Sequence, residues 1–378
     1  MDNRVIIIGP AHHNTLGVIR SMGRMRLKGR IQVILRGNDE CAFTKTKYVN
    51  TKNFYFCKDY AHSIEILLSL APQGDEPKPV VICCSDAAIS EVDLQYDILS
   101  KYFLLPNAKN EVGEITRLLE KNYQISEAKR CGLRIPETLT YRKGEVLEWS
   151  QFPCIIKPLD IHVGGKGDII ICKDLLDLQS VIADLKSSIV IIQPFIEKSL
   201  EFQIIGCSLG DRIIAPGYTK IIRQPYNTNT GYLVFDSLDN LNFNIKQVFE
   251  FIVNIGYTGL FSVEFIRDKS GVDYFLEINM RNDGNAYCVT ASGCNLPYIF
   301  YKFMASGEAP QVENKINRTY LIPDFIDLTE ARKQKVSMIT WFYQFISADA
   351  HTLFDWSDLG PFCFEIRKVL KRYIRKFF

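Results

Sequence analysis

Short apolar runs alternate with helical segments over the first hundred residues, and this alternation limits the possible fold more than any other feature of the sequence. The apolar runs are RVIII at 4–8, IQVIL at 31–35, a weaker run at 53–56 and PVVICC at 79–84. We expect helices between them, at about 16–27 and 60–70. Apolar strands that alternate with helices form parallel sheets covered on both faces. Residues 1–108 are therefore predicted to form a Rossmann-like domain.

The turn that follows the first strand has the sequence Gly-Pro-Ala-His-His-Asn. It lacks the G-x-G-x-x-G pattern of dinucleotide-binding turns, so the sequence does not support dinucleotide binding. His12 and His13 come directly after the strand, at the edge where open α/β sheets bind ligands. A role in an ordinary surface loop is equally compatible with these two histidines.

The rest of the chain has a different pattern. A helical stretch is expected at 111–133, and beyond 139 the apolar runs alternate as strands do, with helices at about 177–186 and 245–256. The part beyond about 310 is predicted to be helical and increasingly basic. A chain of 378 residues should form two or three packed units. We therefore predict an α/β domain, then α+β subdomains, then a helical C-terminal extension.

Composition narrows the possible functions. The formal net charge is +2, from 45 basic and 43 acidic residues, which argues against wholesale nucleic-acid binding. None of the eleven cysteines forms a C-x-x-C pair, and several stand in apolar runs, which indicates buried, reduced thiols. The sequence shows neither a signal peptide nor a long apolar stretch, so we expect a cytoplasmic protein.

The segment EFIRDKSGVDYFLEINMRNDG predicts a hairpin with strands at 261–266 and 273–279. Pairing across its Asp-Lys-Ser-Gly turn places Glu264 opposite Glu277 or a close neighbour, and Asn279 shares a face with Glu277. Facing carboxylates destabilise a sheet unless a cation lies between them. Carboxylate and amide oxygens suit magnesium that is bound together with substrate phosphates. Two solvated glutamates on an outer face are the alternative.

A second candidate feature is a lysine on an apolar strand, Lys157 in CIIKP, which is followed by the loop His-Val-Gly-Gly-Lys-Gly at 162–167. The three glycines of the loop allow backbone amides to turn toward an anion. A lysine beside a core face needs an anionic partner. A glycine-rich hairpin turn with an incidental lysine is the alternative.

A third candidate is the segment IIQPFIEKSLEFQI, in which an apolar strand ends at Gln193. Phe195 and Ile196 could form the walls of an adenine pocket, and Glu201 could accept hydrogen bonds from ribose hydroxyls. On its own, this segment is typical of a plain loop.

The order of these features along the chain resembles that of the ATP-grasp superfamily over about residues 109–310. The most specific part is VEF, ten residues, then LEINMR, which looks like the acidic and E-I-N-P-R ending of that family. Met280 stands where proline is frequent, which weakens the subfamily assignment but leaves the ligand atoms unchanged. The stretch 281–296 is similar to carboxylate–amine ligases related to carbamoyl-phosphate synthetase and D-aspartate ligase. The resemblance implies four ranges: a Rossmann-like domain at 1–108, a small (lid) subdomain at 109–192, a large subdomain with the metal site at 193–310 and a C-terminal extension at 311–378.

The resemblance also implies a role for each group of residues. ATP would be bound by Lys121, Lys157, Gly164, Gly165, Lys166, Gly167, Gln193, Phe195, Ile196 and Glu201. Two magnesium (or manganese) ions would be held by Glu264, Glu277 and Asn279. The γ-phosphate and an acyl phosphate would face Arg281, with Lys220 or Arg223. The acceptor would contact Arg281, Asp283 and Asn285, together with the loop at 224–232.

The implied reaction joins a carboxylate to an amine, with an amino acid as one substrate and an acyl phosphate as the intermediate. Two alternatives stay open at this point. One is a carboxylase-type enzyme that activates bicarbonate as a carboxyphosphate, and the other is a regulatory module that binds ATP without turnover. A homodimer is possible, and the sequence names neither the acid nor the amine.

The last residues, FEIRKVLKRYIRKFF, predict a basic amphipathic helix over 364–378. Its apolar positions are Ile366, Val369, Leu370, Tyr373, Ile374 and Phe377. Such a helix could lie on an anionic membrane or contact a partner. The alternative is a terminal helix that packs on its own core.

Overall fold

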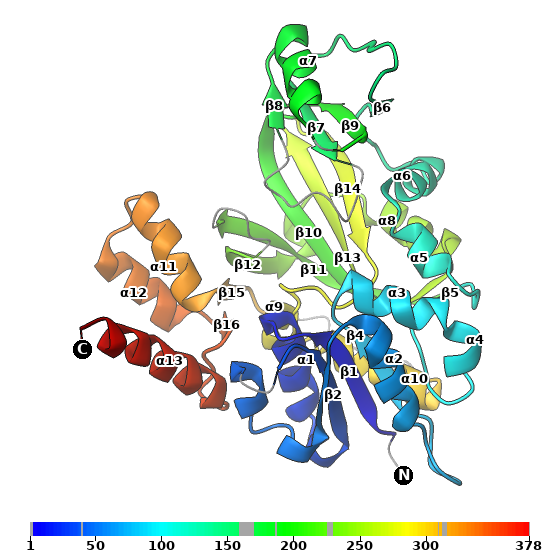
Figure 1. Cartoon of the computed structure of the whole chain (residues 1–378), viewed down its shortest axis with the longest axis vertical. Coiled ribbons are helices and arrows are strands. Elements are labelled where there is room, and N and C mark those ends of the chain that lie inside the picture. The colour runs from blue at the N-terminus through cyan, green and yellow to red at the C-terminus, as the bar shows by residue number, and fades with distance from the viewer. Residues whose placement is uncertain are drawn as a thin grey trace. The chain divides into compact units, whose positions relative to one another are not determined.

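A computed structural model describes residues 3–38, 41–158, 170–185, 187–224, 230–308, 310–311 and 316–377 (Figure 1). The chain forms two compact units that are interleaved in sequence. Unit 1 comprises Met1–Glu120, Phe202–Val263 and Ile278–Phe378, and unit 2 comprises Lys121–Glu201 and Glu264–Glu277. Three strands, β10, β13 and β14, therefore pass from one unit into the other.

Unit 1 begins with a four-stranded sheet of order β3-β2-β1-β4, in which every pairing is parallel. Its strands are β1 Val5–Pro10, β2 Ile31–Arg36, β3 Phe54–Cys57 and β4 Val80–Cys83. The central strand β1 is buried almost throughout, as expected for a strand covered on both faces, and the edge strand β4 is buried as well. The predicted Rossmann-like parallel sheet is confirmed.

The three longest helices of the N-terminal region start at side-chain caps. α1 (His13–Gly23) starts three residues before its predicted position because His12 accepts a hydrogen bond from the Asn14 amide, at 3.4 Å. Asp59 and Ser85 cap α2 (Tyr60–Ser69) and α3 (Asp86–Leu94) in the same way. The remaining elements before residue 120 are the short helices η1 Lys28–Arg30, η2 Ala42–Lys45, η3 Thr51–Asn53, α4 Tyr96–Leu99 and α5 Glu114–Leu118, and the strand β5 Asn107–Ala108.

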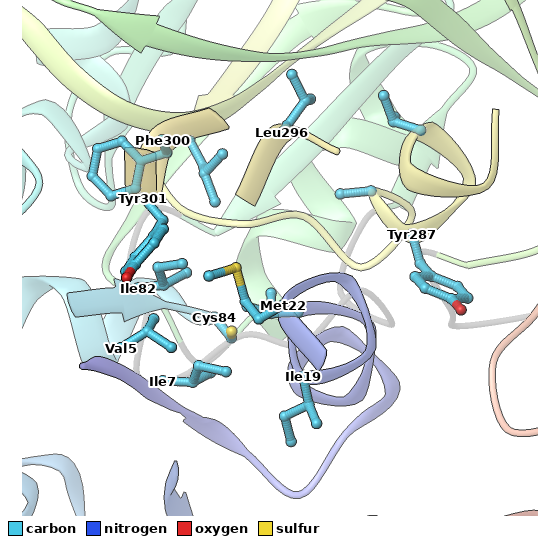
Figure 2. Close-up of a cluster of buried hydrophobic side chains, with 14 of the residues drawn as sticks. Val5, Ile7, Ile19, Met22, Ile82, Cys84, Tyr287, Leu296, Phe300 and Tyr301 are labelled. Atoms are coloured by element: carbon cyan, nitrogen blue, oxygen red, sulfur yellow. The ribbon is translucent and has the colours of Figure 1, made fainter. Parts of the chain in front are cut away.

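A helix distant in sequence completes the core beside this sheet. Figure 2 shows Phe300 and Tyr301 of α10 (Leu296–Ser306) in one cluster with side chains of β1, α1 and β4. The Tyr301 hydroxyl donates to the Asn3 carbonyl at 2.7 Å, and Asn295 donates to the Ser21 carbonyl at 2.8 Å. α9 (Tyr287–Ala291) also contacts α1, so residues 287–306 are an integral part of the N-terminal core.

The second sheet of the chain has eight strands, in the order β14-β13-β10-β11-β12-β15-β16, with β5 paired to β13. Residues 319–322 and 350–351 add strands to this sheet, so the prediction of a purely helical region beyond 310 is wrong there. Its elements are β10 Lys198–Leu209, β11 Ile213–Arg223, β12 Tyr232–Ser237, β13 Tyr257–Asp268, β14 Asp273–Asn279, β15 Thr319–Ile322 and β16 Ala350–His351, with η5 Leu238–Asn240 and α8 Ile245–Asn254 between strands. The C-terminal helices are α11 Asp324–Lys333, α12 Met338–Ser347 and α13 Gly360–Phe377.

Unit 2 contains a separate antiparallel sheet of order β6-β9-β7-β8. Its elements are α6 Lys121–Arg130, β6 Leu139–Arg142, β7 Cys154–Pro158, β8 Ile170–Cys172, α7 Leu175–Asp184 and β9 Ile189–Pro194. Apolar residues of the strands pack against Leu178 and Ile182 of α7. The helical stretch predicted at 111–133 is divided into α5 and α6, and the boundary between the units falls between them.

The eleven cysteines form no disulfide, and eight of them are buried, as predicted. Burial raises the pKa of several thiols, including Cys84 and Cys294, each to about 12. We assign these thiols to the core. Among the described residues, no helix is both long and apolar enough to span a bilayer.

Candidate active site

Lys157 lies on β7, one of the two central strands of the unit 2 sheet. Ile155 pairs with Gln193 of β9, so Lys157, two residues further on, shares a face with that glutamine. Nζ of Lys157 donates to Oε1 of Gln193 at 3.1 Å, and Nε2 of Gln193 donates to the Thr138 hydroxyl at 2.9 Å. The glutamine is therefore held with its oxygen toward the lysine.

The charges around Lys157 come from distant parts of the sequence. Burial lowers the pKa of Lys157, and the positive charge of Lys121 lowers it further, whereas Glu277 and Glu201 act in the opposite direction. Two lysines and two glutamates that were singled out from the sequence thus interact within unit 2. A partly desolvated lysine beside a second cation favours a multiply charged anion as its ligand.

The segment after β9 holds the predicted adenine and ribose contacts. Phe195 is exposed and Ile196 half-buried, which leaves apolar surface available to a planar ligand. The Phe195 amide donates to the Pro153 carbonyl at 2.8 Å, so this backbone N–H is already used within the fold. Glu201 accepts a hydrogen bond from Lys198 at 2.6 Å, in a pair that is partly exposed to solvent.

The predicted hairpin is confirmed: β13 and β14 are neighbouring strands joined by a tight turn. The Asp268 carboxylate accepts from the backbone amides of Ser270 and Val272, at 2.8 and 2.9 Å, and Gly271 adopts a positive φ of 89°. These contacts fix the turn between the strands that carry Glu264 and Glu277.

The side-chain contacts between the two strands differ in register by one residue along the hairpin. Near the turn, Arg267 forms an ion pair with Asp273 at 2.7 Å, and Phe265 contacts Phe275 with ring centroids 6.0 Å apart. Farther along, Asn279 donates to the Ser262 hydroxyl at 3.2 Å. If the register of the first two contacts continued, residue 279 would lie opposite residue 261. We interpret this shift as a bulge, a feature that redirects side chains and is frequent beside active sites.

Arg281 follows β14 and forms the centre of a polar group in unit 1. It contacts Asp86 at 3.2 Å and Asp283 at 3.1 Å, and it donates to the Asn279 side-chain oxygen at 3.1 Å. Burial alone would lower the pKa of Arg281, but the two carboxylates outweigh burial and raise it. This guanidinium is therefore charged at every physiological pH.

Asp283 and Asn285, predicted to contact the acceptor, belong to the same buried group. Asp283 accepts from the Ser262 hydroxyl at 3.1 Å and from the Asn285 amide at 2.8 Å. Asn285 in turn donates to Gln203 at 3.2 Å. The predicted acceptor residues are thus brought together with Arg281 and Asn279 by the segment that follows β14.

His12 and His13 lie at the carboxyl end of β1, next to this group. Burial lowers the pKa of His13 to about 3, and Nε2 of His13 is 3.0 Å from the Thr230 hydroxyl. Burial and Arg281 lower the pKa of His12, while Asp283 acts in the opposite direction. Both imidazoles are neutral at pH 7, and the choice between a ligand site and a surface loop stays open.

Arg223 and Lys220, which were both predicted to face the phosphates, have different surroundings. Arg223 is buried and forms a two-bond ion pair with Asp327, at 2.9 and 2.6 Å, with a further bond to Gln344. This pair gives Arg223 a structural role, and its predicted role toward the phosphates stays a prediction. Lys220, on the same strand, is exposed to solvent.

Part of the predicted site lies outside the described residues: Gly164, Gly165, Lys166 and Gly167 of the glycine loop, and residues 225–229 of the loop at 224–232. Sequence reasoning missed Asp86, Thr138 and Ser262, which bind Arg281, Gln193 and Asp283. Asp86 could have been found, because Ser-Asp directly follows a predicted parallel strand, at the edge where ligands bind.

Comparison with known proteins finds similar solved structures. No family model and no curated protein matches the sequence. An L-amino acid ligase from Bacillus licheniformis is 17% identical, with a TM-score of 0.62 over 85% of this chain and 81% of that one. An N5-carboxyaminoimidazole synthetase from Staphylococcus aureus is 16% identical, with a TM-score of 0.62 over 88% of both chains. The biotin carboxylase domain of the Hydrogenobacter thermophilus 2-oxoglutarate carboxylase, solved with MgADP and bicarbonate, is 17% identical, with a TM-score of 0.61 over 83% of this chain and 73% of that one.

These similarities establish the fold. The chain has the ATP-grasp fold, with a parallel N-terminal sheet and antiparallel sheets after it, as the sequence resemblance implied.

Proposed function

We propose that this chain is an ATP- and magnesium-dependent ligase that joins a carboxylate to an amine, with an amino acid as one substrate. The observation that carries the proposal is the setting of Lys157, a half-buried lysine that donates to Gln193 and shares its surroundings with Lys121, Glu277 and Glu201. The L-amino acid ligase and the biotin carboxylase domain with MgADP have the same fold, which supports this choice.

The reaction has two chemical steps. A carboxylate oxygen of the acid attacks the γ-phosphorus of ATP, the bond to the β-phosphate oxygen breaks, and ADP leaves. The amine nitrogen then attacks the acyl carbon, inorganic phosphate leaves and the nitrogen loses a proton. Phosphoryl transfer of this kind needs positioning and charge neutralisation rather than a protein nucleophile. We assign Lys121 and Lys157 to the phosphates, and Gln193 to the orientation of Lys157.

The donor groups on the hairpin fit magnesium. Glu264 and Glu277 lie on adjacent strands, both half-buried, and Asn279 is two residues beyond Glu277 in β14. No group of three or more His, Cys, Asp or Glu in the described part of the chain could hold a metal ion. Two carboxylates and an amide suffice for magnesium, since it retains water and binds substrate phosphates as well. When bound, the ion supplies neutralisation of phosphate charge.

The group around Arg281 suits the acceptor. Its guanidinium already donates through two nitrogens to Asp86, so a substrate carboxylate would take the place of Asp86 in two-bond geometry. The carboxylates of Asp86 and Asp283 could then bind an ammonium group. A group with both signs of charge matches the two charges of an amino acid. The neutral imidazole of His12 could accept the proton that the attacking amine loses.

A screen for ADP release tests this proposal. Purified protein is incubated with ATP, magnesium and pools of amino acids, each with and without bicarbonate and with and without an added small carboxylate. We expect ADP and phosphate to form only when an amino acid is present. Release that depends on bicarbonate alone would replace the ligase with a carboxylase-type enzyme, and no release with any acceptor, despite measurable ATP binding, would favour a non-catalytic module.

A further inference from the structure

The helix α12 (Met338–Ser347) is apolar on its outer side as well as its inner side. Its sequence, MITWFYQFIS, contains no charged residue, and Trp341 is its one buried residue. Five large apolar side chains of this helix are exposed: Met338, Ile339, Phe342, Tyr343 and Ile346. Ile339 is 85% exposed and Tyr343 is 73% exposed. The positions follow helical spacing, so they form a stripe that faces solvent. A helix that is apolar on all sides is normally covered.

The neighbouring elements extend this apolar surface with aromatic side chains. Trp356 is 82% exposed and contacts Phe354, with ring centroids 4.8 Å apart. Phe354 also contacts Phe345 of α12 and Phe362 of α13, at 5.9 and 5.1 Å. α11, α12 and α13 therefore form one group, seen from orange to red in Figure 1.

The exposed charges of the same region are nearly all positive. Over 324–371, six basic residues are exposed: Arg332, Lys333, Lys335, Arg367, Lys368 and Lys371. Asp349 is the one exposed carboxylate over this range, since the other acids are buried or half-buried. The half-buried Glu330 and Glu365 are each paired with a lysine, Lys333 at 3.3 Å and Lys368 at 3.8 Å.

The C-terminal helix does not cover the exposed apolar surface over its described part. α13 is helical, as predicted, but Val369 and Leu370 are 40% and 55% exposed. The side chains from 372 on are outside the described residues. The first part of α13 packs on the rest of unit 1, since Phe364 contacts Lys45 of η2. The exposed residues at 367–371 do not take part in this packing.

We propose that α12 and the basic residues beside it bind the surface of an anionic lipid bilayer. Apolar and aromatic side chains such as Ile339, Phe342 and Tyr343 would enter the headgroup boundary, and Lys333 and Lys335 would attract anionic headgroups. A symmetric dimer through this face would bring the same basic residues of two chains together. The excess of like charge makes an anionic surface the better match than a second copy.

Sedimentation with vesicles tests this inference independently of ligase activity. Full-length protein is mixed with vesicles of phosphatidylcholine alone or of phosphatidylcholine with phosphatidylglycerol, at low and high salt. We expect binding to the anionic vesicles, weaker binding in high salt and little binding to the neutral vesicles. The double variant Ile339→Ser/Ile346→Ser should weaken binding by at least about tenfold, and Lys333→Gln/Lys335→Gln should do so at low salt.

The controls use exposed apolar and basic residues elsewhere in unit 1. Leu94→Ser/Ile98→Ser and Lys52→Gln/Lys58→Gln should bind the vesicles as the unchanged protein does. Light scattering of all variants measures the oligomeric state. The proposal is overturned if the unchanged protein ignores anionic vesicles, if the controls weaken binding equally, or if Ile339→Ser/Ile346→Ser instead converts a dimer to a monomer.

Discussion

Lys157 shows how function conflicts with stability at the scale of single residues. Burial disfavours its charged form, and Lys121 adds repulsion, so the folded chain holds a cation in surroundings that do not suit one. A stably folded protein has no need of such a group, whereas a phosphate-binding site does. The lysine is therefore expected to matter more for activity than for folding.

The variant Lys157→Met should separate these two roles. We expect kcat/KM for ATP to fall by about 10²–10³-fold, since a charge-neutralising group is lost. Its midpoint of urea unfolding should stay the same or rise, because an apolar side chain replaces a partly buried charge. Lys173→Met, at an exposed lysine of the same unit, is the control and should leave both measurements unchanged. Equal loss of stability and activity at Lys157 would contradict this account.

His13 predicts a dependence of stability on pH. Its pKa is about 3 in the folded chain and 6.5 in the unfolded chain, so the unfolded chain binds the proton more readily below pH 6.5. The contribution of His13 is complete above pH 6.5 and is lost as pH falls toward 3. Between pH 6.5 and 5 the loss is about 2 kcal/mol.

Urea unfolding at pH 7 and pH 5 measures this loss. The variant His13→Asn should show a smaller difference between the two pH values than the unchanged protein. An equal difference in both proteins would mean that His13 is accessible to protons in the folded state.

At the scale of secondary-structure elements, the Arg223–Asp327 pair joins β11 to α11, and the Trp341 indole, which donates to Asp327 at 3.0 Å, adds α12. Both ions are almost fully buried. Removing one partner would leave an uncompensated buried charge. Arg223→Met should therefore lower the free energy of unfolding by about 3–5 kcal/mol.

The double variant Arg223→Met/Asp327→Leu should recover much of that loss, since neither charge remains. The exposed Arg212→Met is the control. At a temperature where each variant is folded, ADP release should be close to that of the unchanged protein. A folded Arg223→Met protein without activity would restore the catalytic role predicted from the sequence.

The helix α10 gives a second prediction at this scale. Phe300 is 1% exposed and packs in the core of unit 1. Phe300→Ala should lower the free energy of unfolding by about 3–5 kcal/mol, because it leaves a cavity. Phe342→Ala on the exposed face of α12 should change it little. Chemical denaturation followed by circular dichroism compares the two, and similar losses would contradict the packing described for α10.

At the scale of the whole molecule, local sequence patterns predicted the individual helices and strands well. They predicted less well how the chain divides into units. The strands of the parallel sheet, the hairpin at 264–279 and the helix at 245–254 follow from apolar periodicity and turn residues. The sequence could not indicate that residues 287–306 complete the N-terminal core, since long-range packing leaves no local pattern. The ion pair of Arg223 was missed for the same reason, because its partner Asp327 is about a hundred residues away.

The same limit applies to the candidate site. An ordered motif predicts Lys157, Glu201 and Glu277 as site residues, and their roles stay predictions, whereas Thr138 and Asp86 act on side chains that are near only in the folded chain. The four proposed ranges remain a prediction of the subdomain organisation.

The central claim is that an acid is activated by phosphoryl transfer before the amine attacks. The substrate that supplies the activated carboxylate in the ADP-release screen is labelled with oxygen-18 in that carboxylate, and the inorganic phosphate formed with ATP is analysed by mass spectrometry. The account predicts one labelled oxygen in each phosphate, since the carboxylate oxygen that attacks the γ-phosphorus leaves with it. ADP release that yields unlabelled phosphate in every turnover would contradict the account.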